Sequence, residues 1–477
     1  MARFFRLYKN DEQALYIQAA DGLRLQILDG VFRPGDRLPS VRRLSDELGV
    51  NPATIVAAYR ILANEGLIES RTGSGVFVSA LEKPGVLPGP ERPDAAANAL
   101  HDKVPQLYDL ASNSPARSLY PLDDMKRFLV EAIDMDGGKA FDYQNSPGYL
   151  PLKTVLSERL SQANNCSILA GDVHIVSGAQ QGLDLAARLL LRRGDVAIVE
   201  SPGYRGARDA FLAAGARVVP LPMGKNGADL DMLEAIAARQ PVRLVYVNPQ
   251  FQNPSSQSYS HDAMERLASL AVRYGFYVLE DDQLSELAYD AEARKGKLLS
   301  VRAFDKAERV VFVKSFSKTL MPGLRIACLE APRIFREGIE SIKRSIDINS
   351  SGLMQRVLER FLSTRRHDER LVSLRAHYKN AARTFTAALE PYRHRGLDWD
   401  EPRGGLNLWL RLPDGCSGTA LASRLAASGC SVVPEAVFRF EKGFLADEHV
   451  RLSFGSTEPE KLQAAAKLVA EKSQELL

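Results

Sequence analysis

The sequence has few cysteines and no long apolar run. Its four cysteines, Cys166, Cys328, Cys416 and Cys430, are far apart and form no C-x-x-C pair, and no cluster of histidines accompanies them. A zinc site and a disulfide framework are therefore disfavoured, and we expect buried free thiols in a reducing cytoplasm and no bound metal. There is neither a run of about 18 apolar residues nor an apolar signal segment at the N-terminus. These absences predict a soluble cytoplasmic protein with no membrane partner.

The 477 residues also carry little net charge. Lys and Arg number 62 and Asp and Glu number 59, which gives +3. Total charge therefore does not indicate a polyanionic partner, and any surface that binds nucleic acid has to be a local patch. A hydrophobic content of 45% is typical of folded globular protein and excludes disordered and collagen-like chains. At about 100 to 200 residues per domain, the length predicts two to four domains.

Residues 79–106 separate a short block from a long one. This segment is rich in proline, contains glycine and shows no hydrophobic periodicity, which is typical of an extended linker. A loop of this length inside one compact domain would be unusual. We therefore predict a domain of residues 1–78, a flexible linker of residues 79–106 and a second domain of residues 107–477.

The short block has the pattern of a helix-turn-helix. Apolar residues at helical spacing predict a first helix over residues 14–28. Ser40 is a candidate N-cap for a second helix that stops at Gly49. Asn51 is the candidate N-cap of a third helix, and Pro52 suits its first position. Two short helices joined by a Gly-containing turn are typical of DNA-binding helix-turn-helix units.

The block ends in a predicted β-hairpin over residues 67–78 with a Gly-containing tip. The second helix of a helix-turn-helix enters the major groove, and a hairpin wing can reach the backbone. The residues expected to contact DNA are Arg42, Arg43, Asn51, Ala53, Thr54, Arg71, Thr72 and Gly73. Residues 1–78 contain ten Lys and Arg residues against nine Asp and Glu residues, so a winged helix that binds protein is the alternative.

Residues 38–78, LPSVRRLSDELGVNPATIVAAYRILANEGLIESRTGSGVFV, resemble the GntR-type winged-helix domain. The resemblance implies that Arg42, the start of the recognition helix at Asn51 to Thr54 and the glycine region of the wing contact operator DNA. Pro52 stands where the family usually has Arg. One base-reading cation is thereby lost, and the family's base preferences do not transfer to this sequence.

The long block alternates helices with short apolar strands. Helices are expected over 180–191 and 261–274, and from about Gln355 the sequence is helix-rich. Unbroken Val and Ile runs suit strands that are covered on both faces, which predicts an α/β fold with a mainly parallel sheet and a smaller α+β C-terminal subdomain. The predicted strands are 173–178, 196–201, 217–222, 243–249, 276–282 and 309–315, followed by 406–412 and 449–455 in the tail.

The segment SFSKTLMPGLRIA, residues 315–327, suits a phosphorylated aldehyde. Lys318 would form a Schiff base with the carbonyl, and Ser315, Ser317 and Arg325 would hold the phosphate. The alternative for this short motif is an exposed loop with a solvated lysine. Lys314 is a rival for the Schiff base, although it stands on the other side of the S-x-S-K pattern.

Other strand ends carry groups that complete such a site. Gly178 joins a strand to a helix and leaves the amides of Ala179 and Gln180 free for a phosphate. Asp281 could pair with a protonated pyridine nitrogen, or it could belong to a cluster of acids that caps a helix. The remaining candidates are Tyr204 for stacking on the ring, Asn253 for the ring's 3-oxygen and Arg451 for a carboxylate.

These segments together resemble the fold-type I aminotransferases that use pyridoxal 5'-phosphate, over about residues 107–473. The resemblance implies the roles given above, with Lys318 as the Schiff-base lysine and Asp281 as the partner of the pyridine nitrogen. Tyr143 matches a family tyrosine that reaches the phosphate in the neighbouring subunit, which implies a homodimer. Gln283 and Leu284 stand where the family has a tyrosine, so transamination is in doubt, and the family's usual NPTG reads NPSS.

The two resemblances together are those of the MocR-type subfamily of GntR regulators. They imply a DNA-binding transcription regulator that depends on pyridoxal phosphate and senses an amino compound or the cofactor itself, with operator DNA as its partner. The alternative is an active aminotransferase with an accessory winged helix. A regulator whose second domain has lost the cofactor is a third possibility.

Overall fold

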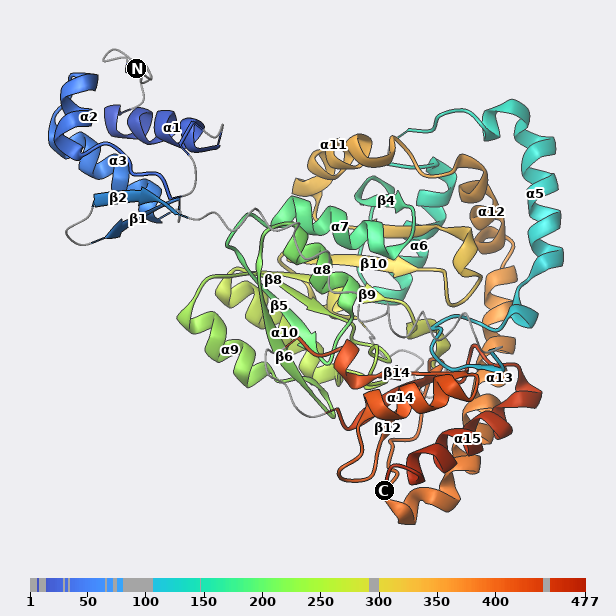
Figure 1. The fold of residues 1–477 in the computed structure, drawn as a ribbon. Coiled ribbons are helices and arrows are strands. Elements are labelled where there is room, and N and C mark those ends of the chain that lie inside the picture. Colours follow the sequence, from blue (N-terminus) through green and yellow to red (C-terminus); the bar gives the residue numbers. More distant parts are fainter. Residues whose placement is uncertain are drawn as a thin grey trace. The chain divides into compact units, whose positions relative to one another are not determined.

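The computed structural model describes residue 7 and residues 14–28, 31–32, 35–64, 67–71, 75–79, 106–145, 147–290, 300–440 and 447–477. The chain divides into two compact units, Met1–Pro93 and Asp94–Leu477 (Figure 1). Most of the predicted linker, residues 80–105, lies outside the described residues, so its expected flexibility stays a prediction. Across the described segments, no helix is long and apolar enough to cross a membrane.

The first unit is a three-helix domain that ends in a hairpin. Its elements are α1 (Leu15–Leu28), α2 (Val41–Leu48), α3 (Pro52–Asn64), β1 (Ile68–Arg71) and the antiparallel β2 (Gly75–Val78). The predicted caps are confirmed, because Ser40 Oγ accepts from the amide of Arg43 at 3.3 Å and Asn51 Oδ1 accepts from the amide of Ala53 at 2.9 Å. Gly49 ends α2 with a φ of +64°, a conformation that glycine adopts without strain.

A small apolar core holds this unit together. Leu23 of α1, Leu44 of α2, and Ile55 and Leu62 of α3 are each fully buried within it. Burying one such side chain contributes about 1.5–3 kcal/mol, so the core fixes the angle between α2 and α3. The hydroxyl of Tyr59 also donates to the carbonyl of Pro39 at 2.6 Å, which ties α3 to the segment before α2.

The second unit is built on an eight-stranded, mainly parallel sheet with the order β4-β11-β10-β9-β8-β5-β6-β7. Its strands are β4 (Val173–Val176), β5 (Val196–Ser201), β6 (Arg217–Gly224), β7 (Gly227–Ala228), β8 (Val242–Val247), β9 (Tyr277–Asp282), β10 (Val310–Ser315) and β11 (Ala327–Glu330). The strands predicted in this block are all present, and the mainly parallel α/β prediction is confirmed. The sequence did not reveal the antiparallel strands β7 and β11, which are only two and four residues long.

Helices cover both faces of this sheet (Figure 1). One face packs against α7 (Ala179–Leu190), α8 (Arg205–Ala213) and α11 (Arg336–Asp347). The other face packs against α5 (Leu122–Asp136), α6 (Leu150–Asn164), α9 (Leu230–Arg239), α10 (His261–Tyr274) and α12 (Gly352–Ser363). Side chains alternate between the faces along each strand, so Leu279 lies in the first core and Val278 in the second. By the same alternation, Asp281 and Glu280 lie on opposite faces.

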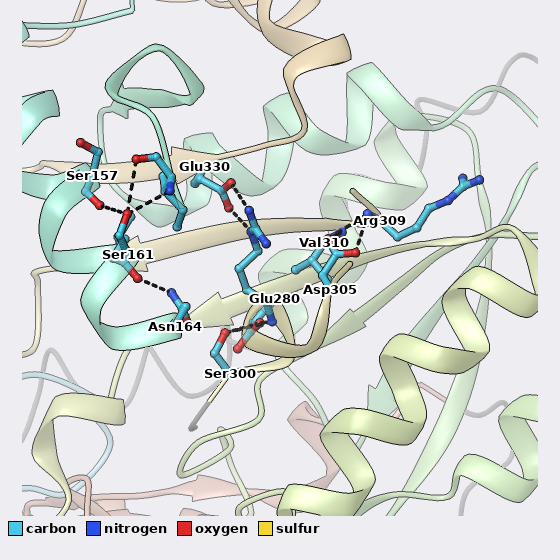
Figure 2. Close-up of polar contacts among 12 residues, drawn as sticks. Ser157, Ser161, Asn164, Glu280, Ser300, Asp305, Arg309, Val310 and Glu330 are labelled. Carbon is cyan, nitrogen blue, oxygen red and sulfur yellow. Dashed lines mark hydrogen bonds and ion pairs between the residues drawn. The ribbon is translucent and has the colours of Figure 1, made fainter. Parts of the chain in front are cut away.

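A polar cluster ties the segment after residue 299 to the sheet. Figure 2 shows Glu280 of β9 beside Ser300, whose hydroxyl donates to the carboxylate at 2.9 Å. The guanidinium of Arg302 donates to both carboxylate oxygens of Glu330 on β11, at 2.9 and 3.1 Å. Burial raises the pKa of Glu280 to about 8. Because Glu280 lies on the face opposite Asp281, we assign this cluster to the stability of the sheet.

A smaller α+β subdomain follows the large sheet. It contains α13 (Arg366–Leu389), β12 (Asn407–Arg411), α14 (Gly418–Ala427), β13 (Cys430–Ser431), β14 (Val433–Pro434), β15 (His449–Ser453) and α15 (Leu462–Gln474). Three of these strands form an antiparallel sheet in the order β12-β15-β14. The short strand β3 (Tyr108–Asp109) pairs in parallel with β13, which brings residues 110–113 to this subdomain. The predicted C-terminal subdomain is therefore confirmed.

Candidate functional site

The residues predicted for the cofactor follow strands that end at one edge of the sheet. The strands β5, β8, β9 and β10 are parallel neighbours, and β4 has the same direction because β11 is antiparallel to both β4 and β10. The carboxyl ends of such strands meet at one edge, where ligands of α/β sheets bind. Residues 178–180 follow β4, Tyr204 follows β5, Asn253 follows β8, Asp281 lies at the end of β9, and Ser315 ends β10, with residues 316–318 after it. The parallel sheet thus gathers segments that are far apart in the sequence.

Lys318 lies in the turn that follows β10, beside the segment from residues 110–113. Its ammonium Nζ donates to the backbone carbonyl of Asn113. Burial lowers the pKa of Lys318 to about 8, the cations Arg451 and Arg325 act in the same direction, and the Asp281 carboxylate opposes them. A lowered pKa increases the fraction of neutral amine, which is the form that attacks a carbonyl. Asn113 was not among the predicted residues, because nothing in the sequence marks a backbone carbonyl.

Lys314, the rival lysine, lies in a different environment. It pairs in register with Asp282 on the face of the sheet opposite Asp281. Its Nζ donates to Asp282 Oδ2 at 2.8 Å and lies 3.2 Å from Glu286 Oε2. Burial alone would lower the pKa of Lys314, but Asp282 and Glu286 outweigh this effect and raise it. Lys314 therefore stays charged as a structural cation, and Lys318 is the only one of the two suited to react.

Asp281 is fully buried, and only one of its two carboxylate oxygens is used. Oδ2 accepts from the hydroxyl of Tyr246 at 2.9 Å and from the side-chain amide of Gln283 at 2.8 Å. Oδ1 is also buried but has no hydrogen-bond partner in the described part of the chain. Burial raises the pKa of Asp281 to about 6, and the donors Gln283 and Tyr246 oppose this rise. A buried carboxylate oxygen without a partner suits a ligand N–H group, such as that of a protonated pyridine.

The positions that depart from the aminotransferase pattern take other roles. Gln283 donates to Asp281, whereas Leu284 is buried in the apolar core of the C-terminal subdomain near Phe251 and Gly405. Tyr246, which was not predicted from the sequence, supplies the second donor from β8. Only the pairing of β8 with β9 brings Tyr246 beside Asp281, so the register of the sheet is the signal that was lacking.

The start of α7 offers a candidate anion site. Gly178 has a φ of +94°, and a Cβ atom there would collide with the guanidinium of Arg325. Arg325 Nη2 donates to the carbonyl of Ser177 at 2.9 Å, which fixes the cation beside this turn. The first amides of a helix have no partner within the helix and favour anions. The predicted phosphate ligands Ala179 and Gln180 occupy these positions, Ser315 ends β10, and Ser317 lies in the turn that follows.

Two loops beside this turn carry the predicted ring contacts. The hydroxyl of Tyr204 donates to Gln180 Oε1 at 3.0 Å, which holds the half-buried tyrosine over the start of α7. Asn253 is buried, and its backbone amide donates to Asn248 Oδ1 at 3.0 Å. Glu200 at the end of β5 in turn accepts from the amide of Asn248 at 3.0 Å. The segments that follow β5 and β8 therefore share one hydrogen-bonded network.

Arg451 of β15 faces the same site from the C-terminal subdomain. Its Nη1 donates to Asn253 Oδ1 at 2.8 Å, and its Nη2 donates to the carbonyl of Ala111. Its Nε is buried and has no hydrogen-bond partner among the described residues. Burial lowers the pKa of Arg451 to about 10, so the guanidinium remains charged at neutral pH. A buried guanidinium with unused hydrogen-bonding capacity suits a ligand carboxylate.

Tyr143 does not join this cluster within its own chain. Its side chain is 84% exposed and lies in the segment after α5. Large exposed apolar side chains occur in the same part of the sequence: Leu122, Val130, Ile133, Met135, Phe141 and Leu150. Several large exposed apolar side chains in one part of the chain are consistent with an interface with another protein chain.

The predicted DNA contacts on the helices lie at the surface of the first unit. Arg42, Arg43, Asn51 and Ala53 are exposed, and Thr54 is half-buried. Arg43 forms an ion pair with Glu47 at 2.9 Å, whereas Arg42 has no ion pair with any described residue. The side chain of Arg71 and the residues Thr72 and Gly73 lie outside the described part of the hairpin. Their predicted contacts with DNA therefore stay predictions.

Comparison with known proteins gives a match for each of the two units of the chain. The family described as bacterial regulatory proteins, gntR family, matches residues 15–78, and aminotransferase class I and II matches residues 106–469. The HTH-type transcriptional regulator TauR of Rhodobacter capsulatus is 31% identical over 457 residues, which cover 91% of each chain. The probable rhizopine catabolism regulatory protein MocR of Rhizobium meliloti is 28% identical over 419 residues, covering 85% of this chain and 83% of that protein.

The second unit also matches solved enzyme structures. One is LysN, an α-aminoadipate aminotransferase from Thermus thermophilus, complexed with N-(5'-phosphopyridoxyl)-L-leucine. The TM-score is 0.69 at 27% sequence identity, and the match covers 77% of this chain and 92% of that chain. The match to an aminotransferase thus extends to nearly the whole length of the enzyme.

Proposed function

The chain belongs to the MocR-type regulators, which join a GntR-family DNA-binding domain to an aminotransferase class I and II domain, and we propose that its second domain is a sensor that binds pyridoxal 5'-phosphate. The observation that carries this proposal is the pair formed by Lys318 and Asp281 at one sheet edge. Lys318 has a lowered pKa, and one buried oxygen of Asp281 has no hydrogen-bond partner among the described residues and could accept from a ligand. The effector is an amino compound that carries a carboxylate, or pyridoxal phosphate itself.

Each part of the cofactor has candidate partners in the site. Lys318 would hold the aldehyde carbon and Asp281 Oδ1 the pyridine nitrogen, and Asn253 would meet the 3-oxygen. When bound, pyridoxal phosphate supplies an aldehyde that combines with amines and a ring that withdraws electrons. The remaining candidates are Tyr204 for the ring face and Ala179, Gln180, Ser315, Ser317 and Arg325 for the phosphate. The phosphopyridoxyl compound in the matched aminotransferase supports this assignment.

The sensing step requires that a ligand binds two conformations of the protein with different affinities. Arg451 belongs to the C-terminal subdomain, whereas Lys318 and Asp281 belong to the large sheet. A ligand whose carboxylate meets Arg451 while its amine occupies the Lys318 site would contact both subdomains. Such a ligand would stabilise the arrangement in which the subdomains are close, and this difference is what the DNA-binding domain would report.

The proposal includes a homodimer. Tyr143 is too exposed to serve its own site, and the apolar residues of the same region would be covered in a dimer, in which Tyr143 could reach the partner's phosphate site. Sedimentation should therefore give a dimer, which Leu122→Asp weakens by placing a charge in the interface.

The proposal also divides the chain into a DNA-binding domain of residues 1–78, a linker of residues 79–106 and a cofactor-binding domain of residues 107–477. Limited proteolysis should cut first within residues 79–106.

The first test measures cofactor binding and DNA binding in the same preparation. Adding pyridoxal phosphate to the full-length chain should produce a visible absorbance band. Lys318→Ala should abolish the band, whereas Lys467→Ala, on the exposed side of α15, should retain it. The affinity for a duplex that the protein selects from a random library should then change when the cofactor or an amino acid is added. An affinity that no such addition changes would refute the sensor.

The second candidate is an active aminotransferase with an accessory DNA-binding domain. Lys318, Asp281 and Arg451 together favour it, because a reactive amine, an acid for the ring and a carboxylate site are the groups that such chemistry needs. Steady conversion of an amino acid and a keto acid by the cofactor-loaded chain, with no selected duplex, would favour the enzyme over the regulator. Binding of a selected duplex with at most a single turnover would favour the regulator.

A further inference from the structure

The recognition helix presents an apolar surface at its N-terminal end. Along α3, Ile55, Ala58, Tyr59 and Leu62 are buried against the rest of the domain. The opposite side of the helix exposes Pro52, Ala53, Val56, Arg60 and Ala63. Val56 is 53% exposed, the largest apolar side chain of this face. The first two turns of α3 therefore expose alkyl groups on this face, and the first cationic side chain there is Arg60.

Few polar side chains stand at this end of α3. Asn51 Oδ1 accepts from the amide of Ala53, and Thr54 is half-buried. On α2, Arg43 is held by Glu47. Among the described residues, no arginine or lysine stands on the exposed face of α3 before Arg60. The bidentate arginine contact with guanine, the commonest specific contact in the major groove, is therefore lacking at the start of this helix.

The family places DNA against this face, and one group on DNA matches its chemistry. In a helix-turn-helix the N-terminal turns of the second helix approach the base edges in the major groove. The C5-methyl of thymine is the apolar group on those edges. We propose that Val56, together with Pro52 and Ala53, reads the operator through contacts with thymine methyl groups. This inference rests on the DNA-binding function of the first domain, and Arg42 and Arg60 would contact the flanking phosphates.

The proposal makes a quantitative statement about single methyl groups. Burying one methyl-sized group is worth about a fourfold change in affinity. A thymine that touches Val56 should therefore lose about that factor when it is replaced by deoxyuridine, which lacks the methyl and keeps the same hydrogen-bonding edge. The effect should be confined to one or two positions in each half-site, because two turns of helix span only a few base pairs.

The test begins with duplexes that the full-length protein selects from a random library. Each thymine of the selected site is replaced in turn by deoxyuridine, and the affinity is measured by fluorescence anisotropy. Where a replacement weakens binding, the T·A pair is changed to C·G with and without a methyl on cytosine C5. That methyl lies at the same place in the groove as the methyl of thymine. It should restore about fourfold in affinity over unmodified cytosine.

A variant then assigns the methyl contact to a side chain. Val56→Ala should bind thymine and deoxyuridine equally at the sensitive position. Val272→Ala on α10, an equally exposed valine at 55%, should keep the preference and serves as the matched control. If no thymine in the selected site can be distinguished from deoxyuridine by the wild-type protein, the proposal is wrong even if Val56→Ala fails to fold. If the library yields no duplex at all, it is DNA binding itself that fails.

Discussion

The face of α3 proposed to read DNA and the edge of the large sheet around Lys318 are built on opposite principles. The face on α3 consists of exposed apolar side chains from one helix. The apolar core of the first unit holds that helix in place against α1 and α2. The sheet edge uses buried polar side chains from several strand ends, and most of them hydrogen-bond to one another. Substitutions on α3 should therefore change recognition and leave the fold intact. Substitutions at the sheet edge should change stability and binding together.

The largest expected difference between the two regions concerns stability. Lys314→Ala would leave the buried Asp282 and the half-buried Glu286 without their cation, and breaking a buried pair such as Lys314 and Asp282 costs about 3–5 kcal/mol. Val56→Ala removes an exposed side chain, and such changes are usually within about 0.5 kcal/mol. Urea unfolding of the full-length chain, followed separately for each unit, measures both. A loss of less than about 1 kcal/mol for Lys314→Ala would contradict the role of Lys314 as a structural cation.

The next effect is on cofactor affinity and its pH dependence. Because burial raises the pKa of Asp281 to about 6, the carboxylate becomes protonated as the pH falls through that value. The pairing with a pyridine nitrogen is then lost, so affinity for pyridoxal phosphate should fall below about pH 6. Tyr246→Phe and Gln283→Leu each remove a donor that opposes the rise. Each should weaken binding by roughly tenfold or more and move this midpoint to higher pH.

Absorbance titrations of the wild type and the two variants at several pH values test this. The exposed Lys467→Ala serves as the control, because it should leave both affinity and midpoint unchanged. A variant that weakens binding equally at all pH values would show that the two donors shape the pocket without acting on the proton of Asp281. In that case Tyr246 and Gln283 would act on cofactor binding through packing alone, and not through their hydrogen bonds to the Asp281 carboxylate.

The two regions also differ in how much of them could be predicted from the sequence. On the N-terminal unit, the capping roles of Ser40 and Asn51 could be predicted because a cap depends on residues two or three positions away. At the sheet edge, the strand ends could be predicted for the same local reason, and α10 begins and ends where its apolar periodicity indicated. The fold class could thus be predicted in full, whereas β11 was missed because four residues carry too little periodicity.

Contacts between distant segments could not be predicted. Tyr246 meets Asp281 because β8 and β9 pair in one register, and a shift by one residue would turn the hydroxyl to the other face. The sequence set Lys314 apart from Lys318 only by its place in the S-x-S-K pattern, whereas the pairing of β10 with β9 shows that Lys314 meets Asp282 on the face opposite Asp281. The roles of the site residues toward cofactor and DNA stay predictions, because they depend on ligands whose contacts only binding measurements can establish.

The smallest expected effect compares two neighbouring arginines on α2. Arg42 has no ion pair with a described residue, whereas Arg43 is held by Glu47, so Arg42 is the one free to meet a phosphate. Arg42→Ala should weaken DNA binding at low salt and reduce the dependence of log affinity on log salt by about one unit, because one fewer counterion is released. Arg43→Ala should change this slope less, and neither variant should alter the absorbance of the bound cofactor. Equal slopes for Arg42→Ala and the wild type would contradict a contact between Arg42 and a phosphate. A changed absorbance would mean that the α2 surface and the cofactor site are coupled, so that the two regions would no longer be independent.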